Sequence, residues 1–133
     1  MTNADLAVSI NLSPSACFRR VRRLEADGVI ERYVALVNQK AVGRPTNVFV
    51  EVSLTSQRVD TLDAFEAAVL DCPDILECHL MSGDADYMLR IAVKDAEDYE
   101  RIHRQYLSKF PAVARIRSSF GLRTICKKTA IDA

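Results

Sequence analysis

The sequence is poor in the two residues that interrupt regular structure, with 4 glycines and 4 prolines in 133 positions. This scarcity excludes a collagen-like repeat, and the 49% of hydrophobic and 27% of charged residues exclude a disordered or low-complexity chain. Because domains typically contain about 100–150 residues, the length corresponds to one ordinary domain or two small ones. The composition is that of a globular protein with enough apolar residues for a core.

Long apolar segments and a basic leader are also missing. No run approaches the roughly 18–20 apolar residues that span a bilayer, and Met1–Asp5 lacks the basic residues that open a secretory signal. We therefore expect a cytoplasmic protein with no membrane partner.

Clustered metal ligands and catalytic motifs are absent as well. The cysteines form no C-x-x-C pair and do not cluster with His79 or His103, which argues against a zinc site and favours free, mostly semi-buried thiols. There is no Ser/His/Asp set, glycine-rich phosphate loop or H-E-x-x-H motif. Asp84 and Asp86 could serve acid–base chemistry or a metal, but acidic turns commonly satisfy local backbone groups instead. We expect no catalytic residue, metal or cofactor.

The charge is unevenly distributed, although the whole chain is neutral. Residues 1–45 hold seven basic and four acidic groups, a net charge of +3, and residues 46–133 hold the balancing −3. Such an asymmetry indicates two parts with different roles.

Two short helices are predicted in the basic part. Thr2–Asp5 resembles a capping box before an apolar stripe, and Ser13-Pro14 is a strong helix start, since a hydroxyl cap precedes proline at the first helical position. The second helix should end at Gly28. Its inward face is apolar, with Cys17, Val21 and Leu24 at helical spacing and Phe18 beside them.

Arginines occupy the remaining positions of that second helix. Two arginine pairs on a helix that closely follows another are typical of a helix-turn-helix, whose second helix lies in the DNA major groove. We expect Ser15, Ala16 and Arg19 nearest the bases, after the capping Ser13, and the other arginines on phosphates, namely Arg20, Arg22 and Arg23. Alternatively, the arginines only keep an exposed face soluble. The β-rich run after Gly28 predicts a wing hairpin or a connecting strand, which favours the DNA-binding interpretation.

The second part alternates strands and helices. We place a DNA-binding domain at 1–37, a linker at 38–47, and a second domain at 48–133. In the latter, strands from Val48, from Leu76, from Tyr87 and over 113–122 enclose helices over 58–71 and 96–108. The helix over 58–71 should turn Val59, Leu62, Phe65 and Val69 inward. The order βαββαβ predicts an α+β, ferredoxin-like sandwich with both helices on one face of an antiparallel sheet.

The other sheet face needs a cover, and a second copy of the chain is the simplest one. Its apolar residues favour a dimer interface over a wet surface. We assign to this face Phe49, Met81, Met88, Ile116, Phe120 and Leu122.

Two segments carry a resemblance to a known family. Leu12–Ile30, LSPSACFRRVRRLEADGVI, resembles the recognition helix and turn of the Lrp/AsnC (feast/famine) transcription regulators, and Ser82–Tyr87, SGDADY, is similar to their G-D-x-D-Y turn. The resemblance covers essentially the whole chain. It implies a partial winged helix-turn-helix, because the family opens with a longer helix and this sequence begins inside the second one.

The resemblance also implies partners and a second site. It implies double-stranded DNA, an amino acid or related metabolite as effector, and a homodimer that assembles further, with an octamer favoured. The effector would lie where the Gly-Asp turn of one dimer meets the next. Carried over by position, its contacts are Met81, Ser82, Gly83, Asp84, Asp86, Tyr87, Ser118, Ser119 and Phe120.

Two other classes of function remain as alternatives. One is a ligand-binding and oligomerisation module without effective DNA binding, because the first helix is missing. The other is a small dimeric ferredoxin-like enzyme, which would need an acid or histidine in the interior, where the sequence places Leu, Val, Ile and Tyr.

Overall fold

The computed structural model describes residues 13–129, and the chain divides into two compact units with the boundary after Leu36. The short helix expected from Thr2 lies outside the described residues. None of the described helices is long and apolar enough to cross a membrane.

The first unit contains helix α2, Pro14–Ala26, which begins at the predicted Pro14 and ends just before the predicted stop at Gly28. The Ser13 side chain caps it by accepting a hydrogen bond from the Ala16 amide at 3.3 Å. Gly28 ends it with φ +76°, a left-handed conformation that glycine adopts without strain. Cys17 is buried, whereas Phe18 is 46% exposed rather than inward.

No strand forms over residues 29–37, where a wing hairpin or connecting strand was expected. A strand requires a neighbour for its hydrogen-bond ladder, and this segment has none in the described chain. Its apolar side chains are accordingly exposed, as Tyr33, Val34 and Leu36 are to more than 60%.

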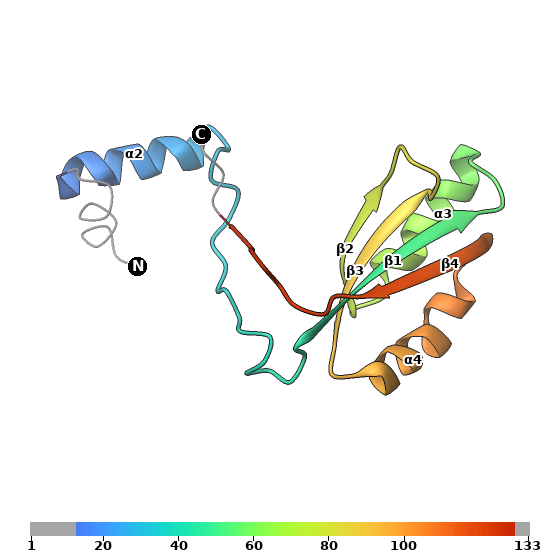
Figure 1. Cartoon of the computed structure of the whole chain (residues 1–133). Helices are drawn as coiled ribbons and strands as arrows, with labels where there is room; N and C mark the ends of the chain where they lie inside the picture. Colours follow the sequence, from blue (N-terminus) through green and yellow to red (C-terminus); the bar gives the residue numbers. More distant parts are fainter. Residues whose placement is uncertain (1–12, 130–133) are drawn as a thin grey trace. The chain divides into compact units, whose positions relative to one another are not determined.

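The second unit has the predicted βαββαβ order, confirmed by strands β1 (Thr46–Leu54), β2 (Ile75–Leu80), β3 (Tyr87–Val93) and β4 (Val113–Phe120) and by helices α3 (Val59–Leu70) and α4 (Ala96–Gln105). A short 3₁₀ turn, η1 (Leu107–Lys109), follows α4. All strand pairs are antiparallel in the order β2-β3-β1-β4, as Figure 1 shows.

Alternation in the central strands builds the core. Val48, Val50 and Val52 of β1 are fully buried, and the same cluster contains Phe65 of α3 and Ile102 of α4. Both helices therefore cover one sheet face. Val59 was expected to point inward but is 74% exposed, because it is the first residue of α3 and does not reach this cluster.

The edge strand β2 is irregular near its start. Ile75 pairs with Ile91 and Glu77 with Arg90, so the register shifts and Leu76 has no partner of its own. The Leu76 side chain is 49% exposed.

Candidate functional site

A cavity of about 230 Å³ lies where β2 turns into β3. From the turn it is lined by Met81, Gly83, Asp84 and Ala85, three of which belong to the predicted effector contacts. Drug-sized ligands occupy roughly 300–1,000 Å³. The volume therefore suits a smaller molecule.

The strand register explains which other side chains reach this cavity. Glu51 of β1 lies opposite Met88 of β3 on one side and Arg117 of β4 on the other, and Ser53 lies opposite Arg115. The residues between them in β1 point into the core, so these five side chains share the opposite, open face of the sheet. We call this cavity the turn pocket.

Charges of both signs line the turn pocket. Arg115 and Arg117 supply two guanidinium groups, and Glu51 and Asp84 supply two carboxylates. Within residues 13–129, none of these four groups has an ion-pair partner within 4.0 Å. The pocket is thus neutral overall but can pair with ligand groups of either sign.

The turn itself is anchored to β1 by Asp86. The Asp86 carboxylate accepts a 2.7 Å hydrogen bond from the Leu54 amide, and Gln57 donates to the same carboxylate. The Asp86 backbone also bonds to Val52 and Met81. Asp86 therefore holds the shape of the turn and does not line the pocket.

Tyr87 lies on the other side of the sheet from the pocket. It is 1% exposed, and its hydroxyl donates to Glu66 of α3. Burial raises the pKa of Tyr87, and the hydrogen bond to Glu66 raises it further. The sequence placed Tyr87 beside the ligand, but the structure places it in the core.

The three predicted contacts in β4 are divided between the two sheet faces. Ser118 bonds to the hydroxyl of Tyr99 in α4, and the Phe120 ring lies edge-on to the Tyr99 ring at 5.6 Å between centroids. Ser119 is opposite Phe49 on the open face. None of the three lines the turn pocket.

This division corrects the predicted apolar face. Ile116 pairs with Val52 and packs against the core, and Phe120 is on the same side, so neither belongs to the open face. Leu122 lies beyond the end of β4. The side of each residue depends on the register between β4 and β1, which the sequence alone does not give.

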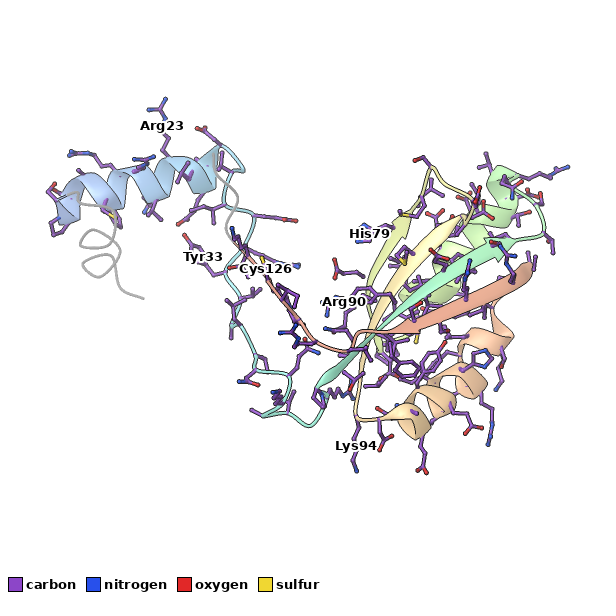
Figure 2. The ribbon with its side chains drawn as sticks, in the orientation of Figure 1. Arg23, Tyr33, His79, Arg90, Lys94 and Cys126 are labelled. Carbon is purple, nitrogen blue, oxygen red and sulfur yellow. The ribbon has the colours of Figure 1, made fainter. Side chains whose placement is uncertain are left out.

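Charged groups fill much of the open face beyond the pocket. Glu77 accepts a hydrogen bond from Arg90 and pairs with His79, and Figure 2 shows His79 and Arg90 on the same side of the sheet. The Arg90 hydrogen bond holds the pKa of the Glu77 carboxyl below its usual value. Arg90 also donates to Asn47 at 3.2 Å. The open face is therefore more polar than predicted.

Sequence reasoning missed several pocket residues. It did not name Glu51, Ser53, Arg115 or Arg117, and the only signal for the arginines was their alternation in β4. Across residues 13–129, no group of three or more His, Cys, Asp or Glu side chains could hold a metal ion.

The arginines of α2 that are predicted to contact DNA are exposed. Arg23 is paired with Asp27 at 3.8 Å, and Figure 2 shows it pointing away from the helix. The Arg22 guanidinium lies 5.5 Å from the centre of the Phe18 ring. Arg19 and Arg20 have no ion pair within the described part of the chain. Ser15 is exposed and Ala16 half-buried.

Comparison with known proteins identifies the class. A winged helix-turn-helix DNA-binding family matches residues 1–31, and the Lrp/AsnC ligand binding domain matches residues 47–131. An HTH-type transcriptional regulator from Sinorhizobium fredii is 46% identical over 118 residues, 89% of this chain and 93% of that protein.

Solved structures agree with the sequence matches. An AsnC family transcriptional regulator from Agrobacterium tumefaciens superimposes with a TM-score of 0.89 at 33% identity, over 99% of this chain and 86% of that one. A transcriptional regulator from Neisseria meningitidis, in complex with L-methionine, gives 0.89 at 30% identity, over 99% and 85%.

A helix-turn-helix DNA-binding segment followed by a ferredoxin-like ligand-binding domain defines a transcription regulator. The chain belongs to the Lrp/AsnC family. The expectation that it is not an enzyme is confirmed, because the family and the relatives are transcription regulators.

Proposed function

We propose that this chain regulates transcription by binding double-stranded DNA through α2, in response to an amino acid or related small metabolite. The observation that carries the DNA-binding part is the exposed arginine face of a helix that begins at Pro14 and is capped by Ser13. Helix N-termini and arginines together contact phosphates and base edges in the major groove. Such a regulator acts in the cytoplasm, where the DNA lies.

The effector would bind beside the Met81–Asp86 turn. The turn pocket supports this assignment, since it brings Met81, Gly83 and Asp84 together around a small volume. The L-methionine complex of the Neisseria meningitidis regulator supports an amino acid as ligand. The other contacts that the family resemblance implies do not line the turn pocket. Ser82, Ser119 and the residues on the helix-covered face would contact the effector from a neighbouring chain or would hold the turn that contacts it.

A second copy would cover the open sheet face and form a homodimer, which assembles further, to an octamer as the resemblance implies. Phe49 and Met81 are 40% and 42% exposed there, and Glu77 and Arg90 lie on the same face. A second copy would cover the apolar side chains and place charges of both signs opposite one another.

DNA binding is tested with duplexes selected from a random pool and quantified by gel shift. We expect selection of a defined sequence, with binding weakened at least tenfold by the double change Arg19→Ala and Arg20→Ala. The matched control is Arg58→Ala, which removes an exposed arginine of the other unit. Binding only after an upstream segment is added would instead favour a ligand-binding module without effective DNA binding for this chain.

The effector is tested by thermal shift against the standard amino acids. A ligand at 100 times its dissociation constant adds about 2.7 kcal/mol to the stability of the folded state. A shift with one chemical group of amino acids supports the proposal. The absence of any shift would refute the amino acid effector and leave a regulator controlled by DNA and assembly.

A further inference from the structure

Positive charge is concentrated at one end of the second unit. Residues 46–120 carry eight basic and thirteen acidic groups, a net charge of −5, whereas the flanking segments 37–45 and 121–129 carry five basic groups and no acidic one. One of the five, Arg44, is paired with Asp74. The other four are exposed and have no ion pair within residues 13–129. We call these four the basic patch: Lys40, Arg123, Lys127 and Lys128.

Sheet pairing brings the two segments of the basic patch together. β1 begins and β4 ends at the same end of the sheet, as Figure 1 shows, because the two strands are antiparallel neighbours. The Gly121 amide donates a 2.8 Å hydrogen bond to the Asn47 carbonyl, which continues this pairing beyond β4. Lys40 and Arg123 line one cavity of about 600 Å³. Cations from distant parts of the sequence therefore lie on one surface.

We propose that the basic patch binds phosphates of the DNA that flanks the bases contacted by α2, so that the ligand-binding unit itself takes part in DNA binding. This inference rests on the proposed DNA-binding function. The four cations lie beyond the strand ends, and the cavity reaches the open sheet face only at Asn47 and Phe49. A second copy on that face would therefore leave the cations to another partner.

The connection from α2 to the basic patch is short. The Tyr33 hydroxyl donates to Glu25 of α2 at 2.6 Å, and Asn38 Oδ1 accepts from the Lys40 amide at 3.0 Å in the turn that precedes β1. The chain from Tyr33 to Asn38 extends to at most about 18 Å. A DNA duplex carries roughly one phosphate charge per 1.7 Å of its axis. While α2 lies in the major groove, the chain therefore holds the patch within reach of neighbouring phosphates.

The charge of the basic patch selects a polyanion as its partner. Exposed lysines and arginines without acidic neighbours create a positive potential that attracts phosphates. Contacts to phosphates strengthen binding to all sequences about equally and depend strongly on salt. The basic patch should therefore add affinity for flanking DNA and leave the base preference to α2.

The test measures binding of the full chain to the selected duplex by fluorescence anisotropy over a series of salt concentrations. The duplex is made in two lengths, one with the recognised sequence alone and one with about 10 base pairs, one helical turn, added on each side. Far-ultraviolet circular dichroism establishes that each variant is folded, and sedimentation without DNA gives its assembly state.

Two triple variants with the same net charge are compared with the unmodified protein. The patch variant carries Arg123→Gln, Lys127→Gln and Lys128→Gln. The control variant also removes three exposed cations, Arg58→Gln, Arg104→Gln and Lys109→Gln. These control positions lie after β1, in the last turn of α4 and before β4, and so away from the end of the sheet that carries the basic patch.

We expect the unmodified protein to bind the long duplex at least about tenfold more tightly than the short one, and the patch variant to lose this gain. On the long duplex, the slope of log affinity against log salt concentration should fall by about two to three in the patch variant, since each phosphate contact contributes roughly 0.9. The control variant should keep both the gain and the slope. Discrimination against mismatched bases should be unchanged in both variants, because phosphates carry no sequence information.

The remaining outcomes separate this inference from the proposed function. If the patch variant and the control variant behave alike, the basic patch is wrong and DNA binding through α2 stands. If the patch variant loses base discrimination, or loses assembly mass without DNA, its cations have another role and the inference is overturned. If the unmodified protein binds no selected duplex, both the DNA-binding function and the basic patch fail.

Discussion

Arg44 and Asp74 connect the segment before β1 to the loop between α3 and β2, with 3.5 Å between Arg44 Nη1 and Asp74 Oδ1. Arg101 of α4 approaches the same carboxylate oxygen at 3.8 Å. Asp74 is only 7% exposed, whereas both arginine side chains are about half exposed. One buried carboxylate thus joins three segments that are distant in the sequence.

Replacing this carboxylate should destabilise the second unit. We expect Asp74→Ala to lower the free energy of unfolding by about 1–3 kcal/mol, less than for a fully buried pair, because both arginines regain water. Urea denaturation followed by circular dichroism measures the change. The control Asp60→Ala removes a well-exposed partner of Arg58 and should change stability by less than about 0.5 kcal/mol. Equal losses for the two variants would contradict the assigned role.

Tyr87 should make stability depend on pH in the alkaline range. Burial is the main cause that raises its pKa in the folded chain, and Glu66 adds to it. The contribution of Tyr87 to the stability of the folded state is therefore complete below the ordinary pKa of about 10 and is lost at higher pH. Tyr87→Phe should cost about 1 kcal/mol at neutral pH and make the decline above pH 10 less steep. Thermal unfolding across that range measures both effects.

The matched control for Tyr87 is Tyr106→Phe, a partly buried tyrosine that packs against the same core. Tyr33 and Tyr99 also have raised pKa values, so part of the decline should persist in every variant. An unchanged pH dependence in Tyr87→Phe would show that the hydroxyl does not contribute.

Two arginines of α2 should affect DNA binding differently. Arg19, nearer the helix start, is predicted to contact bases, so Arg19→Ala should relax base preference. Arg22→Ala should weaken binding to all DNA sequences about equally. It should also lower the slope of log affinity against log salt concentration by about one, because one phosphate contact is lost. Binding of matched and mismatched duplexes over a salt series measures both. Identical effects of the two changes would refute the assignment.

The four cysteines should differ in reactivity with iodoacetamide. Cys126 is exposed, Cys17 and Cys72 are buried, and burial raises the pKa of Cys78 to about 11. Because the thiolate is the reactive form, Cys126 should be modified first at mildly alkaline pH. Mass spectrometry of peptides taken over time measures the order, and Cys126→Ser should remove the fast phase. Equally fast labelling of Cys78 would contradict the prediction.

The sequence predicted the fold better than the site. Hydrophobic alternation and turn signals located α2 and all four strands of the second unit, because these features are local. The side on which Ile116 and Phe120 lie depends on pairing with a distant strand, and it was predicted wrongly. The turn residues Met81, Gly83 and Asp84 were found by resemblance, but Arg115 and Arg117 reach them only through the register of β1 and β4.

The two edge strands of the sheet also affect whether the protein aggregates. β2 and β4 end the sheet, and a flat, regular outer strand would accept strands from unrelated chains and start aggregates. The shift at Leu76 interrupts the regular ladder on one edge, and Arg115 and Arg117 add charge to the other. The register shift of β2 and the charges of β4 therefore protect the sheet from uncontrolled growth.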